Sequence, residues 1–387
     1  MTVTARLDWE LQCSGCEVIA DPAGLPTVCP HCGQPWLVRY PTRRLSLTDR
    51  AETHRGAGMW RFRTFLPLSN GEEPITLGEG DTPLLEIKRT ARALGFSDLW
   101  LKDEGANPTG SFKARGMAMA VTRAVQGGAQ AFVVPTAGNA GVALAAYSAR
   151  AGLPARIYAP ASTPPTILAQ IRRFGAELEL LDGHIGDCGA AATEFASRTG
   201  AFPMSTLREP YRIEGKKTLG LELARQLGWE LPNVIIYPAG GGTGLIGMWL
   251  AFQQLIAAGW VRGSPPRLYA VQSSGCAPVV RAFGSGAQRC EPWADPRTVA
   301  SGLRVPAPLG GSLMLRAIRD TGASAVAVTD EDLSERARTV SRWEGVDLAP
   351  EGGATVAAAV TLREAGAIRP DERVVLFNTG AGWLYRE

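Results

Sequence analysis

The chain alternates between short apolar runs and longer stretches with helical periodicity, and this alternation limits the folds that it can adopt. Its first half predicts, in order, strand 99–102, helix 112–126, strand 131–134, helix 140–151, strand 155–158, helix 164–174, strand 177–181 and helix 186–199. Its second half predicts helix 214–228, strand 234–237, helix 244–259, strands 267–271 and 324–328, helices 330–344 and 353–366, and strand 373–377. Strands that alternate with helices pair in parallel sheets through right-handed crossovers. The sequence therefore predicts two parallel-sheet α/β domains.

Three of these strands run into loops of glycine and small polar residues: Pro135-Thr-Ala-Gly-Asn-Ala-Gly141, Pro238-Ala-Gly-Gly-Gly-Thr-Gly244 and Asn378-Thr-Gly-Ala-Gly382. The second loop is typical of phosphate binding, because glycine lets backbone N–H groups close on an anion and the following helix supplies positive potential. Tight strand-to-helix turns without a ligand use glycine as well. Ligands bind at the carboxyl ends of parallel strands, so we expect these loops to share one site between the two domains.

A fourth polar loop, Asn107-Pro-Thr-Gly-Ser-Phe-Lys113, opens a helical stretch. Asn107 to Gly110 has the composition of a turn, and Ser111 is a plausible helix cap. The oriented dipoles of a helix N-terminus disfavour an ammonium ion, and burial would do the same. We therefore expect a lowered pKa for Lys113, which favours a free amine that can form a Schiff base. The alternative is a surface lysine beside a loop.

In this order, the lysine loop, the asparagine loop, the glycine loop and the strand-end threonine resemble those of the pyridoxal-phosphate enzymes of fold type II, the tryptophan synthase β family. The resemblance covers the chain from about Gly78 to Glu387. It implies that Lys113 carries the cofactor as a Schiff base, that Asn139 contacts its phenolic oxygen and that Thr379 faces its pyridine nitrogen. It further implies a phosphate site made by Gly240, Gly241, Gly242, Thr243 and Gly244.

Within that family, four segments are similar to the threonine synthases: Gly78-Glu-Gly-Asp-Thr-Pro-Leu-Leu85, Asn107-Pro-Thr-Gly-Ser-Phe-Lys113, Glu209-Pro-Tyr-Arg-Ile-Glu-Gly-Lys-Lys-Thr218 and Asn378-Thr-Gly380. The resemblance implies a lyase that converts O-phosphohomoserine and water to L-threonine and phosphate. The substrate would be bound by Thr136, Gly138 and Arg212, with Arg212 as the anchor of its phosphate.

The motifs also depart from the threonine synthase pattern. Ala114 replaces an aspartate, Ala137 and Ala140 replace hydroxyl residues, and Glu209 replaces an asparagine. The Gly-Gly-Gly-Thr-Gly loop is nearer to that of the dehydratases. A serine or threonine dehydratase, or a β-replacement enzyme of the same fold, is therefore the alternative function. A non-catalytic sensor of cofactor or amino acid is a third hypothesis, and the intact Lys113 with its matching loops argues against it.

The N-terminal segment carries a separate signal, the spacing Cys13-x2-Cys16-x12-Cys29-x2-Cys32. Two such pairs of thiolates suit a tetrahedral zinc ribbon, and four protein ligands leave no open position for catalysis. We therefore predict structural Zn²⁺, with iron as the alternative metal. Two disulfides would need an oxidising compartment, whereas the polar residues 1–11 do not resemble a signal peptide.

Length and charge bound the remaining expectations. The chain has 387 residues, a net charge of +3 and 45% hydrophobic residues, enough for two cores and a small appendage. The charge is too small to indicate a nucleic-acid partner, and no apolar run reaches the roughly 18 residues of a membrane span. We expect a cytoplasmic enzyme with a small amino-acid substrate, and the family resemblance implies a homodimer. The predicted domains are a ribbon over 1–42, a large cofactor-binding domain over 43–108 and 208–387, and a small α/β domain over 109–207.

Overall fold

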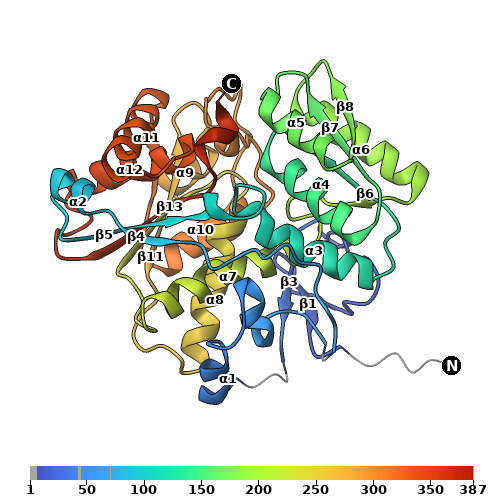
Figure 1. Cartoon of the computed structure of the whole chain (residues 1–387), viewed down its shortest axis with the longest axis horizontal. Helices are drawn as coiled ribbons and strands as arrows, with labels where there is room; N and C mark the ends of the chain where they lie inside the picture. Colours follow the sequence, from blue (N-terminus) through green and yellow to red (C-terminus); the bar gives the residue numbers. More distant parts are fainter. Residues whose placement is uncertain (1–6, 42–44, 70, 387) are drawn as a thin grey trace. The chain divides into compact units, whose positions relative to one another are not determined.

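The computed structural model of the chain describes residues 7–41, 45–69 and 71–386 (Figure 1). These residues form two compact units. Unit 1 comprises Met1–Glu79, Lys113–Thr163 and Ile167–Lys216, and unit 2 comprises Gly80–Phe112, Pro164–Thr166 and Lys217–Glu387. In the part of the chain that the structure describes, no helix is long and apolar enough to cross a membrane.

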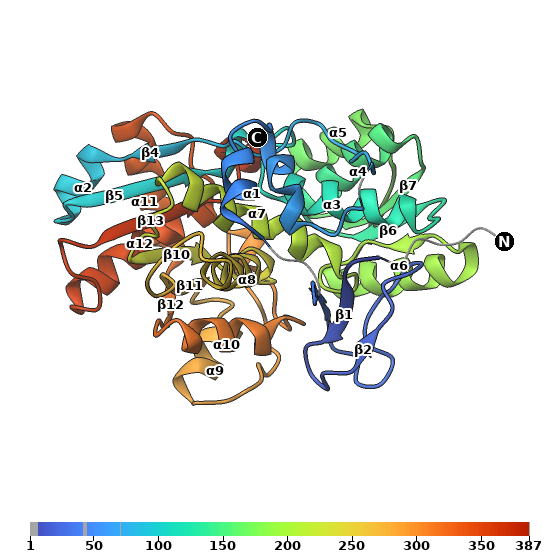
Figure 2. The ribbon, with the colours of Figure 1, turned by 90° about the horizontal axis from the view of Figure 1, so that it is seen from below.

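Unit 1 begins with a small antiparallel sheet in the order β2-β1-β3, drawn in blue in Figure 2. Its strands are β1 (Glu10–Cys13), β2 (Ile19–Ala20) and β3 (Trp36–Arg39). Leu11 pairs with Val38, and both side chains are buried. The sheet packs on the rest of unit 1, because the Arg123 guanidinium lies 4.7 Å from the centroid of the Trp9 ring. The predicted ribbon therefore forms, although residues 1–6 and 42 of its predicted span lie outside the described residues.

The second sheet of unit 1 is parallel throughout and has the order β8-β7-β6-β9. Its strands are β6 (Phe132–Pro135), β7 (Ala155–Pro160), β8 (Glu177–Leu181) and β9 (Phe202–Pro203). The helices along this stretch are α3 (Lys113–Gln126), α4 (Asn139–Ala151), α5 (Pro165–Arg173), α6 (Ile185–Thr199) and α7 (Tyr211–Gln226), which continues into unit 2. The three longer strands were predicted to within two residues. The sequence did not predict β9, because two residues are too few to show an alternation.

Unit 2 contains a six-stranded sheet in the order β12-β11-β10-β13-β5-β4. Its strands are β4 (Leu84–Glu86), β5 (Asp98–Asp103), β10 (Val234–Pro238), β11 (Arg267–Ser273), β12 (Ala325–Val328) and β13 (Arg373–Asn378). All neighbours are parallel except β4, which runs antiparallel to β5 at the edge of the sheet. This antiparallel edge strand was not predicted, and the rest of the sheet confirms the predicted α/β fold class.

Helices cover the large sheet. They are α2 (Lys88–Leu94), α8 (Thr243–Ala257), α9 (Pro278–Gly284), α10 (Gly311–Asp320), α11 (Asp330–Glu344) and α12 (Pro350–Glu364). Helix α12 packs on β10 and β13, whereas α8 and α10 pack on β11 (Figure 1). The central strands β10 and β13 are apolar and almost completely buried, as expected for parallel strands covered on two faces. Shorter helical segments are α1 (Leu47–Glu52), η1 (Gly58–Phe65), η2 (Glu104–Ala106), η3 (Ser301–Leu303) and η4 (Gly382–Tyr385).

Candidate active site and cysteine cluster

In unit 2, the residues just before Lys113 are fixed at the carboxyl end of β13. The Phe112 N–H donates to the Thr379 carbonyl at 3.0 Å, and the Ala381 N–H donates to the Gly110 carbonyl at 2.8 Å. Ser111 forms an antiparallel bridge with Gly380 between these two bonds. The lysine loop and the strand-end threonine, which are more than 260 residues apart in the sequence, are therefore joined through their backbones.

Aromatic rings bring the glycine loop to the same strand ends. Tyr237 lies at the end of β10, directly before this loop. Its ring centroid is 5.3 Å from that of Phe377 in β13 and 6.1 Å from that of Phe112, and the latter contact is edge to face. Such aromatic contacts stabilise by about 0.5–1.5 kcal/mol beyond their buried area. The ends of β10 and β13 and the segment before Lys113 thus form one cluster within unit 2.

The glycine loop itself is shaped for close backbone approach. Gly242 has φ +77°, and a methyl group there would lie 2.2 Å from the Met314 sulfur. A methyl group at Gly240 would lie 2.1 Å from the Gly302 carbonyl oxygen, so side chains are excluded at both positions. The loop leads directly into α8, whose first turn carries no acidic residue. A glycine loop without side chains at a helix N-terminus is compatible with a phosphate group, and the phosphate site at this loop stays a prediction.

A buried polar network holds the turn that precedes Lys113. The Asn107 side chain donates to Glu104 Oε2 at 2.9 Å and accepts the Gly80 N–H at 3.2 Å. Glu104 Oε1 accepts the Thr82 hydroxyl at 2.6 Å. Side chains that bond to one another in a buried network fix a single loop conformation. The Asn107 turn is therefore tied to residues on both sides of β4.

The network continues to a buried ion pair. Lys102 Nζ lies 2.5 Å from Glu222 Oε1, and both side chains are completely buried. Glu222 also accepts the backbone N–H groups of Asp81 and Thr82, at 2.8 and 3.0 Å. Sequence reasoning missed this pair, because its partners are 120 residues apart and the pairing depends on the fold. Both elements contain other charged residues, so the sequence does not single out Lys102 in β5 or Glu222 in α7.

Asn378, the last residue of β13, connects this strand to the segments that contain Asp103 and Ala349. The side-chain NH₂ group of Asn378 donates to Asp103 Oδ1 at 2.8 Å, and its side-chain oxygen Oδ1 accepts the Ala349 N–H at 3.1 Å. Burial raises the pKa of Asp103, although the bond from Asn378 opposes the rise. The predicted cofactor residue Thr379 follows directly and is 6% exposed. The Asn378 side chain thus fixes the position of the residue that precedes Thr379.

In unit 1, the predicted residues occupy helix starts and a strand end. Lys113 is the first residue of α3, and Asn139 is the first residue of α4. Thr136 follows β6, and its hydroxyl accepts the Gly138 N–H at 3.1 Å, which closes a small turn before α4. The local arrangement of strand, tight loop and helix is the predicted one. The relation of these residues to the strand ends of unit 2 stays a prediction.

Helices α3 and α7 touch through their first turns. A methyl group at Gly215 would lie 2.1 Å from the Arg115 carbonyl oxygen, and one at Gly116 would lie 2.9 Å from the Arg212 carbonyl oxygen. Backbone contact of this kind requires glycine on both helices. Lys113 and Arg212 therefore lie at the starts of two helices that cross within unit 1.

Arg212 is buried beside Glu209. Its Nη1 donates to the Met204 carbonyl at 2.8 Å, and its Nε lies 4.0 Å from Glu209 Oε1. Glu209 Oε2 accepts the N–H groups of Tyr211 and Arg212, at 2.8 and 3.0 Å, and so caps α7. Burial raises the pKa of Glu209 to about 7, although attraction to Arg212 and the two N–H bonds oppose the rise. The predicted role of Arg212 as a phosphate anchor stays a prediction.

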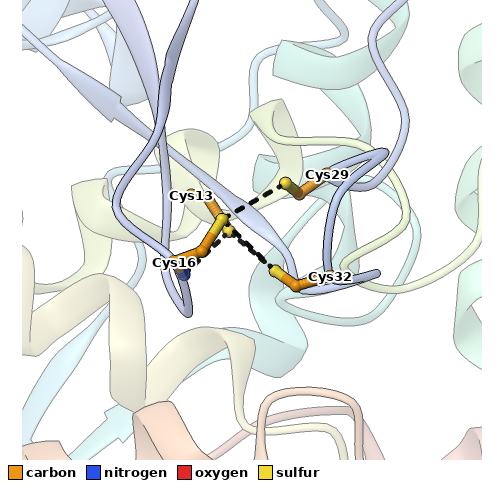
Figure 3. Close-up of side chains that lie close together, drawn as sticks. All are labelled: Cys13, Cys16, Cys29 and Cys32. Carbon is orange, nitrogen blue, oxygen red and sulfur yellow. Dashed lines mark hydrogen bonds between the residues drawn. The ribbon is translucent and has the colours of Figure 1, made fainter.

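The four N-terminal cysteines come together, and Figure 3 shows their side chains pointing toward a common centre from two loops. Their sulfur atoms all lie within 4.8 Å of one another, and the nearest pairs are 3.3 Å (Cys13 to Cys32), 3.6 Å (Cys16 to Cys32) and 3.7 Å (Cys16 to Cys29). None of the four forms a disulfide within the described range. Tetrahedral coordination with Zn–S bonds of about 2.3 Å places sulfur atoms about 3.8 Å apart, so the cluster fits a metal ion of this size.

Backbone groups favour the thiolate form of Cys13, whereas at Cys16 a backbone bond from Val18 is outweighed by burial and by the neighbouring thiols, which raise its pKa to about 12. The N–H groups of Gly15 and Cys16 point at the Cys13 sulfur, at 3.4 and 3.5 Å. Burial opposes ionisation of Cys13, but these two bonds and the neighbouring thiols outweigh it and lower its pKa to about 6. A metal binds the thiolate form, so the surroundings of Cys13 favour metal binding.

Comparisons with known proteins agree with this geometry. A family model described as pyridoxal-phosphate-dependent enzyme matches residues 75–380. A threonine synthase of Methanosarcina acetivorans is 35% identical over 83% of the chain and 79% of its own length. A threonine synthase of Methanocaldococcus jannaschii is 34% identical over 85% of the chain and 81% of its own length. The solved structure of maize serine racemase has a TM-score of 0.69 at 22% identity, covering 78% of this chain and 88% of that one, which shows a shared fold.

Proposed function

Because the chain belongs to the family of pyridoxal-phosphate-dependent enzymes, we propose that it is a threonine synthase, a lyase that converts O-phosphohomoserine and water to L-threonine and phosphate. The observation that carries the proposal is its identity of about one third to threonine synthases over more than four fifths of the chain. The alignments cover about four fifths of both proteins rather than a short segment, which supports the proposal.

We propose that the cofactor residues are those that the sequence predicted. Lys113 would attach the cofactor, Asn139 would contact its phenolic oxygen, and Gly240, Gly241, Gly242, Thr243 and Gly244 would bind its phosphate. Three features support the phosphate site: the positive φ of Gly242, the close approach at Gly240 and the position before α8. When bound, pyridoxal phosphate supplies an electron sink that acidifies the Cα–H and Cβ–H bonds of an amino acid.

The side chains of the protein would move protons and set the reaction type. Lys113 Nζ would take the Cα proton of the substrate and return it, since a lysine released beside that carbon can act as base and then as acid. The Thr379 hydroxyl would face the pyridine nitrogen. A neutral partner there does not enforce protonation of the ring, which favours elimination and replacement over transamination. Arg212, Thr136 and Gly138 would bind the substrate.

The alternative is a serine or threonine dehydratase or a β-replacement enzyme. One specific observation favours it: the carboxyl group of Glu209 lies beside Arg212, where it opposes the binding of a dianionic phosphate. Ala137 and Ala140 also favour this alternative, because they replace the hydroxyl residues of the threonine synthase motifs. A substrate without phosphate would not need Arg212 as an anchor.

We propose structural Zn²⁺ at Cys13, Cys16, Cys29 and Cys32. Four thiolates satisfy a tetrahedral ion, prefer zinc among common divalent metals and leave no position for substrate. We also propose a cytoplasmic homodimer with the domain boundaries predicted from the sequence, by analogy with the family.

A parallel assay tests the function. The purified holoenzyme is supplied with O-phosphohomoserine, L-threonine or L-serine, and phosphate, threonine and keto acid are followed in each reaction. We expect phosphate and threonine from O-phosphohomoserine alone. Keto acid from serine or threonine, with no turnover of O-phosphohomoserine, would replace the proposal by the dehydratase alternative.

A further inference from the structure

The Arg212 guanidinium is buried with few partners. Its side chain is 3% exposed, and the Met204 carbonyl is the only hydrogen-bond acceptor that contacts it among residues 7–41, 45–69 and 71–386. A guanidinium has five N–H donors, and buried donors normally find acceptors. The pairing with Glu209 does not fill them, because 4.0 Å is too long for a hydrogen bond. The guanidinium therefore makes fewer hydrogen bonds within the described residues than it has donors.

One carboxylate oxygen of Glu209 also lacks a hydrogen-bond partner within the described residues. Its Oε2 caps α7, whereas its Oε1 is buried and has no hydrogen-bond partner within the described part of the chain. Burial of a carboxylate oxygen without a hydrogen-bond partner destabilises the ionised form of the carboxyl group. Protonation on Oε1 would remove the charge and create an O–H donor. The unpartnered oxygen thus lies beside the Arg212 guanidinium.

Both groups stand at one helix start. They lie within four residues of each other at the N-terminus of α7, whose first turn is in backbone contact with the first turn of α3. The positive end of α7 and the Arg212 charge both attract an anion, whereas the carboxyl groups of Glu209 and of Glu214, which lies in the first turn of α7, oppose it when they are ionised. Arg212 is the charged group that acts on Glu209, and Tyr211 contributes its backbone N–H. The Tyr211 phenol is in turn affected by the charges of Arg123 and Glu209.

We propose that Glu209 and Arg212 form a proton-linked anion site, in which Glu209 takes one proton from solvent onto Oε1 when a phosphate or sulfate group binds Arg212. The guanidinium and the new Glu209 O–H then both donate to the anion. This inference deepens the proposed function, since it rests on Arg212 as the anchor of the substrate's phosphate. The same chemistry would bind free phosphate, which is the product of that reaction.

The reason for the proton linkage is electrostatic. Ionised Glu209 already neutralises Arg212, so an incoming dianion would face a buried carboxylate at close range. Protonation removes this repulsion, and a carboxyl group whose pKa lies near neutrality can take up the proton at little cost. An asparagine at this position, as in the threonine synthase pattern, would bind without a proton. Glu209 therefore determines how the affinity of the site depends on pH.

Sulfate binding to the holoenzyme tests the proposal, because sulfate does not titrate near neutrality and the bound cofactor keeps the glycine loop filled. The dissociation constant is measured by calorimetry from pH 6 to 9. In the parent protein we expect it to rise about tenfold per pH unit above pH 7, as one linked proton requires. In Glu209→Gln it should be independent of pH, so that the variant binds about 100-fold more tightly than the parent at pH 9.

Two further variants make the test specific. Arg212→Gln should lose sulfate binding, and Arg212→Lys should weaken it if the glutamine variant does not fold. Asp187→Asn is the matched control, since Asp187 also caps a helix of unit 1, at α6, and the variant should keep the pH dependence of the parent. Competition by inorganic phosphate and by O-phosphohomoserine at pH 7 then shows whether both ligands use the site.

A parent protein whose sulfate affinity is independent of pH would overturn the proposal, and so would a Glu209→Gln variant that keeps the slope of the parent. Absent sulfate binding at pH 6, or binding that survives the loss of Arg212, would have the same consequence. These outcomes are separate from the proposed function. Turnover of O-phosphohomoserine without proton-linked sulfate binding would refute this inference alone, and proton-linked binding without turnover would refute the proposed function alone.

Discussion

Replacement of Glu222 by glutamine probes the buried network before Lys113. The substitution keeps the shape of the side chain but removes the negative charge that Lys102 Nζ meets at 2.5 Å. It also replaces one carboxylate oxygen by an NH₂ group, which cannot accept the N–H of Asp81 or Thr82. Loss of one partner from a fully buried ion pair leaves an uncompensated charge and costs about 3–5 kcal/mol. We therefore expect Glu222→Gln to destabilise unit 2 by roughly that amount.

The assay is urea unfolding of the holoenzyme with excess cofactor, for the parent, Glu222→Gln, Lys102→Met and the double variant. Because the two residues are in contact, we expect a coupling energy of at least about 2 kcal/mol, with the double variant more stable than Glu222→Gln. The exposed pair Lys88–Glu86 is the matched control, and Glu86→Gln should change stability by less than about 1 kcal/mol. A loss below about 1 kcal/mol for Glu222→Gln, or strictly additive effects, would refute this reasoning.

The other predictions follow from the proposed roles. Lys113→Ala should abolish the visible absorption of the bound cofactor together with activity, and retention of full turnover would contradict the assignment of this lysine. Cys29→Ser should reduce bound zinc, measured by metal analysis, from about one ion per chain and lower the melting temperature; equal zinc content in parent and variant would contradict the ribbon site. Glu209→Gln should be more stable than the parent by an amount that grows as the pH rises from 4.5 to about 7, because the raised pKa of Glu209 means that its ionisation opposes folding. The upper limit is about 3 kcal/mol from the size of that shift, and a difference in melting temperature that is the same at pH 5 and pH 8 would rule it out.

The sequence predicted most of the parallel strands, because buried strands such as β10 and β13 are continuous apolar runs bounded by turn residues. Two edge strands were not predicted from the sequence. β9 is two residues long, and β4 takes its direction from its pairing with β5. Helix α10 was also not predicted. Its buried Leu313, Met314 and Leu315 are consecutive, so they do not show the spacing of an amphipathic helix, and its start is rich in glycine.

The local surroundings of the site residues were predictable for a similar reason. Turn residues and glycines mark the loops around Lys113, Asn139 and Gly242 directly in the sequence. The groups that support those loops were not predictable, since Lys102 and Glu222 meet only after folding. Glu209 was visible as a departure from the family pattern, but its unpartnered oxygen beside Arg212 appears only in three dimensions.

The fate of oxygen during turnover of O-phosphohomoserine tests the central claim most directly. The reaction is run with the holoenzyme in ¹⁸O-labelled water, and threonine and phosphate are analysed by mass spectrometry. A threonine synthase breaks the C–O bond, so we predict one threonine per phosphate, with the label in the threonine hydroxyl group and none in the phosphate. Label in the phosphate would indicate P–O hydrolysis, and keto acid in place of threonine would indicate a dehydratase. Either result, or no release of phosphate at all, would contradict the account.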